Sequence, residues 1–433
     1  MGAKYFGEVG YFDFYQCAIE AGGKTVGWSD ETITRDLRTY NLLPSKDVPA
    51  CHRERFSEAR WLEYKNDVAW IIKEGDQQNH LPNLDLVTDK GFNPTPFWSV
   101  VAGDLANAFP SQKGLALTLL MMVDFLVFVF SIAFIRWKEG DTLAILTALL
   151  TLFYFGAFHS LGGQFLQYIW FLCIIVSTVL WRAKKPFSSG VLMGLAIGIR
   201  SFPLFFAAPM FCVAFYSLIK KQKNIPVIIF CAGCITAMLM CFIIGSTSTR
   251  GVSAWQEWSE KISVHEKYLR GEIFEIGLPN LISTIASEEN GNASNYLEDF
   301  PHTLLRIARF EKFIFLYYAL AGTLLALWAW LLWKNRSLEV FGYGFIPLYV
   351  LTSLSPIYYL SLALLPCMFG GAPIRIRNYA VGGTLLLMVA HLPFLLSGYI
   401  TFNYYDHLIS GILIFLFFIG MVYVWHKEES LAP

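Results

Sequence analysis

Ile225-Pro-Val-Ile-Ile-Phe-Cys-Ala-Gly-Cys-Ile-Thr-Ala-Met-Leu-Met-Cys-Phe-Ile-Ile-Gly245 is an apolar run that contains no charged side chain. A helix of about 20 residues is long enough to cross the roughly 30 Å of hydrocarbon in a bilayer. A helix also satisfies the backbone polar groups of its own segment, which lipid cannot do. The run therefore predicts a membrane-spanning helix.

Similar apolar runs fill most of the chain after residue 114. They lie near residues 115–135, 142–158, 164–181, 187–200, 203–219, 310–333, 338–354, 357–372, 379–398 and 408–425. Of all residues, 55% are hydrophobic and only 15% are charged, which is unlike a soluble domain. We therefore expect an all-α polytopic membrane protein with about eleven transmembrane helices.

Polarity divides the chain into four segments. Residues 1–113 mix acids, bases and prolines, and they predict a polar region outside the bilayer. Residues 114–245 and 310–433 form two transmembrane bundles, and residues 246–309 form one long loop between them.

Basic residues predict the orientation of these segments. They gather in every second short loop, at Arg136 and Lys138, Arg182 to Lys185, Lys220 to Lys223, Lys334 and Arg336, Arg375 and Arg377, and Lys427. The positive-inside rule makes those loops and the C-terminus cytoplasmic, so residues 1–113 and 246–309 face outward from the cytoplasmic membrane. An outward N-terminal region needs a preceding span, so we expect one more helix upstream of Met1, about twelve in all.

Charge and motifs exclude several functions. Lys and Arg number 33 and so do Asp and Glu, a balance that argues against a nucleic-acid binder. The chain has no G-x-x-x-x-G-K loop, no strand-associated G-x-G-x-x-G and no D-x-D pair, so pockets for soluble nucleotides are not expected.

Two of the eight cysteines stand apart from the others. Cys17 and Cys51 lie in the polar region, whereas Cys173, Cys212, Cys231, Cys234, Cys241 and Cys367 lie in apolar runs and are expected to be buried thiols. In an oxidising compartment Cys17 and Cys51 are a disulfide candidate, and two free thiols are the alternative.

The segment around residues 190–203 combines glycines with a helix break. Gly190, Gly194 and Gly198 recur at every fourth position, which predicts close approach of a neighbouring helix backbone. Arg200 and Pro203 then break the helix near the outer surface. Arg200 is a candidate for binding a phosphate through parallel hydrogen bonds, and an interfacial arginine at lipid headgroups is the alternative.

Other candidate contacts lie in the predicted outward segments. His159 and Gln164 flank a Gly-Gly turn, and His265 follows Trp255 and Trp258 in the long loop. His159 and Gln164 can hydrogen-bond a ligand, and a simple turn is the default alternative. The aromatic residues beside His265 suit a sugar face, and the membrane interface is the simpler alternative.

Acids and arginines cluster in the polar region. Glu8 and Asp13 flank Gly10-Tyr-Phe12, and Arg35 and Arg38 follow in Thr34-Arg-Asp-Leu-Arg. An ionised carboxylate near the membrane surface can act as a general base, and solvated ion pairs are the alternative.

Several motifs together resemble a known family. They are Gly2-Ala-Lys-Tyr-Phe-Gly-Glu-Val-Gly-Tyr-Phe-Asp-Phe-Tyr15, Asn93-Pro-Thr-Pro-Phe-Trp98, Gly162-Gly-Gln164 and Gly194-Leu-Ala-Ile-Gly-Ile-Arg-Ser-Phe-Pro203. The chain resembles GT-C-type membrane glycosyltransferases, and among them the glycosyltransferase 87 group of polyprenol-phosphate-sugar-dependent mannosyltransferases.

The resemblance implies a reaction and roles for residues. A mannose-like hexose would pass from a polyprenyl-phosphate donor to a lipid or cell-envelope glycan acceptor by inverting displacement on the outer face. Asp13 or Glu8 would be the base and Arg200 would hold the donor phosphate, with substrate contacts from His159, Gln164, His265, Arg35 and Arg38. No cofactor is required, and a divalent metal is optional.

Two alternatives from other classes remain. A noncatalytic subunit of a larger membrane assembly would have the same composition. A secondary transporter would show inverted repeats with broken helices in both halves, and only the segment at 187–203 shows a break.

Overall fold

The structure is a computed structural model of the whole chain. It describes residues 1–23, 27–77, 85–108, 114–153, 168–272, 275–285, 296–334, 340–353, 356–396 and 404–431. This part of the chain is helical apart from one antiparallel ribbon, in which β1 (Ile33–Arg35) pairs with β2 (Leu42–Pro44). The prediction of an all-α architecture is confirmed.

The chain divides into two compact units. The first unit comprises residues 1–120, 240–268 and 295–300, and the second comprises residues 121–239, 269–294 and 301–433. The beginning of the long loop therefore groups with the N-terminal polar region.

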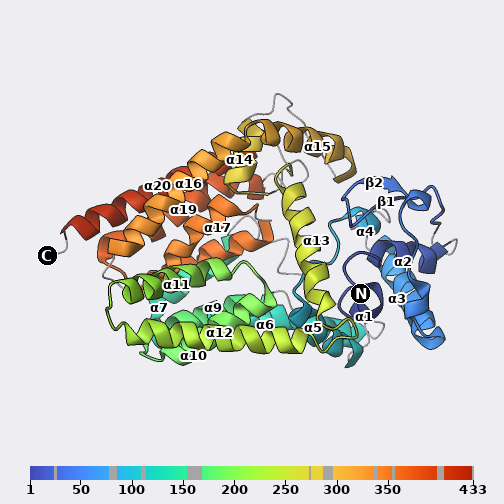
Figure 1. Cartoon of the computed structure of the whole chain (residues 1–433), viewed down its shortest axis with the longest axis horizontal. Coiled ribbons are helices and arrows are strands. Elements are labelled where there is room, and N and C mark those ends of the chain that lie inside the picture. Colours follow the sequence, from blue (N-terminus) through green and yellow to red (C-terminus); the bar gives the residue numbers. More distant parts are fainter. Residues whose placement is uncertain are drawn as a thin grey trace. The chain divides into compact units, whose positions relative to one another are not determined.

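Short elements make up most of the first unit, whose N-terminal part is blue in Figure 1. Its helices are α1 (Phe6–Val9), α2 (Phe14–Gly22), α3 (Glu58–Gln77), α4 (Asp85–Thr88), α5 (Pro96–Ala108) and α13 (Ser253–Leu269), with 3-10 turns at Ser45–Asp47 and Arg53–Arg55. The ribbon of β1 and β2 lies between α2 and α3 in sequence.

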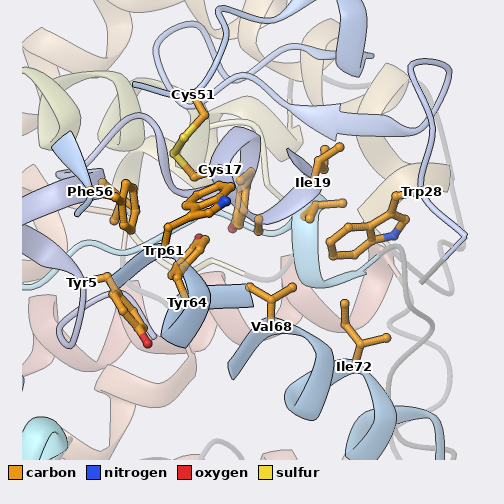
Figure 2. Packing of buried hydrophobic residues seen from close by; sticks show 14 of the residues in the cluster. Tyr5, Cys17, Ile19, Trp28, Cys51, Phe56, Trp61, Tyr64, Val68 and Ile72 are labelled. Carbon is orange, nitrogen blue, oxygen red and sulfur yellow. A yellow bond between two sulfur atoms is a disulfide. The ribbon is translucent and has the colours of Figure 1, made fainter. Parts of the chain in front are cut away.

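An aromatic core holds the first unit together. Helix α3 presents Trp61, Tyr64, Val68 and Ile72 on one face, at the three- and four-residue spacing of a helix, and all four are buried. Figure 2 shows Tyr64 beside Tyr5, with ring centroids 4.7 Å apart in an edge-to-face arrangement. The core therefore joins the N-terminal residues to α3.

Apolar helices dominate the second unit. They are α6 (Gly114–Glu139), α7 (Asp141–Phe153), α9 (Ile169–Arg182), α10 (Pro186–Ile199), α11 (Leu204–Ile219), α12 (Ile225–Gly245), α16 (Ile314–Lys334), α19 (Ile374–Leu396) and α20 (Tyr404–Leu431). The other elements are α14 (Leu278–Ile285), α15 (Tyr296–Lys312), α17 (Phe345–Leu351), α18 (Leu365–Met368) and 3-10 turns at Phe341–Gly344 and Pro356–Leu364. Helices α6, α12 and α15 each begin in one unit and end in the other.

Four helices in the described part of the chain are long and apolar enough to cross a membrane. They contain Thr118–Glu139, Ile225–Gly245, Ile314–Lys334 and Gly411–Glu428. Several shorter apolar helices accompany them, including α9, α10 and α11. The protein is thus a helical membrane protein, while the count of eleven spans and their orientation stay predictions.

Helices α10 and α12 pack with their backbones almost touching. A Cβ atom at Gly194 would lie 2.5 Å from the carbonyl oxygen of Cys234, and one at Gly190 would collide with the carbonyl oxygen of Phe230. The close approach predicted for Gly190 and Gly194 is therefore confirmed.

We expect Gly190→Ala to destabilise the second unit by about 3 kcal/mol or more, because its Cβ collides with rigid backbone. The matched control is Gly322→Ala in α16, where a Cβ has nothing within 4 Å. Thermal unfolding of the detergent-solubilised chain compares the two variants. Equal melting temperatures would contradict the packing role of Gly190.

Candidate functional site

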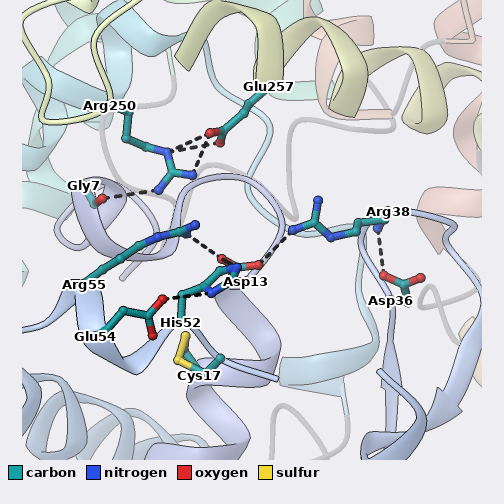
Figure 3. A network of polar contacts seen from close by, with 11 residues as sticks. Gly7, Asp13, Cys17, Asp36, Arg38, His52, Glu54, Arg55, Arg250 and Glu257 are labelled. Atoms are coloured by element: carbon teal, nitrogen blue, oxygen red, sulfur yellow. Dashed lines mark hydrogen bonds and ion pairs between the residues drawn. A yellow bond between two sulfur atoms is a disulfide. The ribbon is translucent and has the colours of Figure 1, made fainter. Parts of the chain in front are cut away.

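Asp13 is the centre of a polar network in the first unit. It immediately precedes α2, and its side chain is only 6% exposed. Its Oδ1 accepts a hydrogen bond from Arg38 Nη2 at 3.2 Å, and its Oδ2 accepts one from Arg55 Nη1 at 2.7 Å. Figure 3 shows both guanidinium groups pointing toward the carboxylate, with His52 Nε2 3.9 Å from Oδ2. Asp13 thus joins three segments that are distant in sequence.

A disulfide fixes part of this network. The structure joins Cys17 to Cys51. Cys17 lies one helical turn after Asp13 in α2, and Cys51 directly precedes His52. The bond therefore holds residues 51–55, with their cations, against the helix that carries Asp13.

Glu8, the second candidate base, belongs to a different set of ion pairs. Its Oε1 accepts from Arg60 Nε at 2.8 Å, and Arg60 Nη1 also binds Glu63 at 2.8 Å. In the same region Lys4 Nζ and the Tyr5 hydroxyl both donate to Asp67, at 2.6 and 2.7 Å. These contacts attach the N-terminal residues to α3.

Arg250 connects the long loop to the N-terminal residues. Arg250 binds both carboxylate oxygens of Glu257, with Nη2 2.7 Å from Oε1. Its Nη1 donates to the carbonyl oxygen of Gly7 at 3.3 Å. Gly10, with φ +56°, lies against this guanidinium, where a Cβ would be 2.6 Å from Cζ. Only glycine fits that position, between the two candidate bases.

Arg35 and His265 meet in a separate buried cluster around Tyr40. The Tyr40 hydroxyl lies 2.8 Å from His265 Nδ1 and 2.7 Å from Lys261 Nζ, which donates to it. Arg35 Nη1 donates to the Tyr40 carbonyl oxygen at 2.9 Å. Arg38 is not part of this cluster, since it binds Asp13 instead.

One face of α13 supplies the second half of this cluster. Ala254, Trp258, Lys261, His265 and Tyr268 follow one another at spacings of three and four residues, so they share a face of the helix. Ala254, Lys261 and Tyr268 are buried, and Trp258 and His265 are half-buried. Sequence reasoning missed Lys261 and Tyr40, although this spacing links Lys261 to His265.

Burial alters proton binding in the Tyr40 cluster. Desolvation is the main cause that lowers the pKa of Lys261 to about 7; the positive charge of Arg35 acts in the same direction, and Asp89 and Asp36 act against it. Desolvation, aided by Lys261, Lys90 and Arg35, also holds the pKa of His265 well below its ordinary value. Neutral His265 is therefore the expected form at pH 7.

We expect the first unit to become more stable between pH 7 and pH 10.5. The pKa of Lys261 is about 7 when folded and 10.5 ordinarily, so the unfolded chain binds more protons across this window. Below pH 7 the full cost of burying the charged Lys261 side chain applies. This cost lowers the free energy of unfolding by a few kcal/mol, at about 1.4 kcal/mol per pKa unit.

Thermal unfolding at a series of pH values checks this expectation in wild type and Lys261→Met. The variant should lose the rise in stability with pH and should melt higher at pH 7. Lys46→Met, which removes a half-exposed lysine paired with Glu31, is the control and should keep the rise. An identical pH dependence in Lys261→Met and wild type would contradict the expectation.

Arg200 lies in the second unit, at the predicted helix break. Helix α10 ends at Ile199, Arg200 is extended with φ −139° and ψ 140°, and α11 begins after Pro203. The break is therefore confirmed, and the Arg200 side chain is half-buried. His159 and Gln164 lie outside the described residues.

Asp124 is buried in the second unit, in α6. It is 1% exposed, and its Oδ1 accepts a hydrogen bond from the backbone N–H of Tyr168 at 3.0 Å. Tyr168 precedes α9, so the carboxylate lies at a helix N-terminus, where the peptide dipoles favour negative charge. As for metals, the described residues contain no group of three or more His, Cys, Asp or Glu able to hold an ion.

Comparison with known proteins places this helical membrane protein in a family. The sequence model of glycosyltransferase family 87 matches residues 95–356, which is more than half of the chain. The chain belongs to glycosyltransferase family 87, as its motifs predicted, and is a membrane glycosyltransferase of that family. No curated protein and no solved structure matches it.

Proposed function

We propose that the protein transfers a mannose-like hexose from a polyprenyl-phosphate donor to a lipid or cell-envelope glycan hydroxyl, on the outer face of the cytoplasmic membrane. The family match over residues 95–356 carries this proposal. The lack of nucleotide-binding motifs in the sequence supports a lipid-linked donor. The disulfide between Cys17 and Cys51 supports an outward, oxidising location for the first unit.

Asp13 is our proposed general base. The bond from Arg55 to Oδ2 is the shorter one, whereas Oδ1 is held at 3.2 Å by Arg38, whose side chain is 45% exposed. An acceptor hydroxyl that displaces Arg38 gains access to Oδ1. The acceptor oxygen then forms the bond to the anomeric carbon as the bond from that carbon to the phosphate oxygen breaks. The hydroxyl proton passes to Oδ1, and the departing phosphate keeps the electron pair.

Other residues have supporting roles in this proposal. Arg200 holds the donor phosphate, because a guanidinium can donate two parallel hydrogen bonds to it. Arg38, Arg35 and His265, together with His159 and Gln164, contact the substrates, and Glu8 is the second choice of base. No cofactor is required for the displacement, and a divalent metal is optional.

Transfer of radiolabelled mannose tests the proposed donor. The full chain in proteoliposomes is given a short-chain polyprenyl-phosphate mannose or a nucleotide mannose, and labelled glycolipid is extracted. We expect product from the polyprenyl donor alone, and Arg200→Ala should lower its formation by about a hundredfold or more. Arg136→Ala, which removes an exposed arginine of the same unit, is the control.

Each other result rejects part of the proposal. If product forms only from the nucleotide mannose, the proposed polyprenyl-phosphate donor is wrong and a nucleotide sugar takes its place. No transfer from either donor by a folded chain would favour a noncatalytic subunit. Movement of the donor across the bilayer without transfer would favour a transporter.

A further inference from the structure

Two buried cations in the first unit have no carboxylate partner among the described residues. Arg35 is 1% exposed and Lys261 is 0% exposed. Lys261 Nζ donates to the Tyr40 hydroxyl at 2.7 Å and to the Lys90 carbonyl oxygen at 3.1 Å. Neither cation forms an ion pair with any acid among the residues that the structure describes. Burying an unpaired charge costs several kcal/mol, so this arrangement needs an explanation.

The acids that act electrostatically on Lys261 are bonded elsewhere. Asp36 Oδ1 accepts from the backbone N–H of Arg38 at 3.0 Å, and its Oδ2 accepts from the Thr39 hydroxyl at 2.7 Å. Asp89 Oδ1 accepts from the backbone N–H of Gly91 at 2.8 Å. Both carboxylates therefore stabilise turns and leave the cations without a direct counter-ion.

The Arg35 guanidinium is held on two of its three nitrogens. Nε donates to the Thr88 carbonyl oxygen at 2.8 Å, and Nη1 donates to the Tyr40 carbonyl oxygen at 2.9 Å. Its plane lies over the ring of Tyr268, with Cζ 4.8 Å from the centroid. Nη2 is buried and has no acceptor in the described part of the chain. A guanidinium fixed in this way presents one free N–H edge to an incoming acceptor.

The backbone around these cations adopts an unusual conformation. Tyr40 has φ +66°, which is uncommon for any residue except glycine, and Gly91 has φ +72°. A non-glycine residue in this conformation costs about 1 to 3 kcal/mol, and such residues cluster where a site must be held in one shape. Here the Tyr40 hydroxyl donates to the Lys90 carbonyl oxygen at 2.9 Å and lies 2.8 Å from His265 Nδ1.

We propose that Arg35, Lys261, Tyr40 and His265 form a binding site for a phosphate group, either free or esterified to a lipid. Phosphate supplies the acceptor that Arg35 Nη2 lacks and the negative charge that both cations lack. Lys261 can turn its third N–H toward the ligand, while the Tyr40 hydroxyl, which accepts from Lys261 and donates to the Lys90 carbonyl oxygen, holds the ammonium in place. This site is distinct from the donor-phosphate contact proposed for Arg200, and it rests on the proposed function in so far as it deepens the substrate contacts given there to Arg35 and His265.

Binding should be coupled to proton uptake by Lys261. Because the pKa of this ammonium is about 7 in the free protein, much of it is neutral at pH 8, and a bound anion favours the charged form. The other groups near it are Arg35, which stays charged, His265, Asp36, Asp89 and Lys90. We expect uptake of about one proton on binding at pH 8 and an affinity that falls as pH rises above 7.

Isothermal titration calorimetry of the full chain in detergent tests the site. Inorganic phosphate and a short-chain prenyl phosphate are the two probes, each in buffers of different ionisation enthalpy. Lys261→Met should abolish the proton uptake and weaken binding by about 30-fold or more. Arg35→Gln tests the other cation of the site. Lys261→Met removes a buried charge, so it is expected to fold even if Arg35→Gln does not. Lys46→Met should match wild type.

The results separate the sources of phosphate. If Lys261→Met weakens the binding, tighter binding of the prenyl phosphate assigns the site to a lipid, and equal binding of the two probes assigns it to the free ion. Absence of binding by either probe would reject the site, as would binding to Lys261→Met with unchanged affinity and proton uptake. Glycosyl transfer is measured separately, so failure of this site removes only the substrate contacts of Arg35 and His265 and leaves the proposed transfer reaction to its own test.

Discussion

Asp13→Asn is expected to slow glycosyl transfer by about a hundredfold to ten-thousandfold, because an amide cannot take the acceptor proton. Asparagine keeps the shape of the side chain and one acceptor oxygen for Arg55 or Arg38. The initial rate of product formation from the polyprenyl-phosphate donor measures the effect. Asp30→Asn, at an exposed position in the same unit, should retain the wild-type rate.

Arg55→Gln separates a catalytic Asp13 from a purely structural one. This variant removes the 2.7 Å contact but leaves the carboxylate in place. A general base should still work in Arg55→Gln, while both variants lose some stability because an ion pair between the buried Asp13 and the partly exposed Arg55 is weakened or broken. If transfer falls equally in the two variants and in step with their melting temperatures, Asp13 only holds the fold. Glu8→Gln tests the second candidate in the same assay.

Loss of the disulfide is the second large effect. We expect Cys17→Ala with Cys51→Ala to destabilise the first unit by about 4 kcal/mol, since the bond closes a loop with a sequence separation of 34. Residues 51–55 would also lose their attachment to α2, so Arg55 would bind Asp13 less firmly. Thermal unfolding with and without reductant measures both consequences.

Reductant should lower the melting temperature of wild type to that of the double variant and leave the double variant unchanged. Cys212→Ala, which removes a half-buried free thiol of the second unit, should respond as wild type does. A wild-type melting temperature that is insensitive to complete reduction would contradict the role given to this bond.

Local patterns in the sequence predicted much of the helical architecture. The apolar run at residues 225–245 corresponds to α12, and the break at Arg200 to Pro203 separates α10 from α11. The glycine spacing predicted the contact later found at Gly190 and Gly194. Each of these features depends on periodicity or on a residue's own backbone preference, so neighbouring residues suffice to reveal it.

The polar contacts of the first unit could not be predicted in this way. Asp13 binds Arg38 and Arg55, which are 25 and 42 positions away, and Lys261 binds Tyr40 across 221 positions. Such pairings depend on which loops meet in three dimensions, and spacing along the chain carries no information about them. The sequence showed that acids and arginines gather, but their individual partners required the structure.

The glycine contact between α10 and α12 also has a consequence for synthesis of the protein. The ribosome completes Gly190 before it makes Phe230, and about 40 residues take roughly 2 to 8 s to translate. During that interval the side-chain-free face of α10 has no α12 to cover it. Lipid or the insertion machinery must occupy this face until the later helix arrives. The final packing of α10 can therefore form only after α12 has inserted into the membrane.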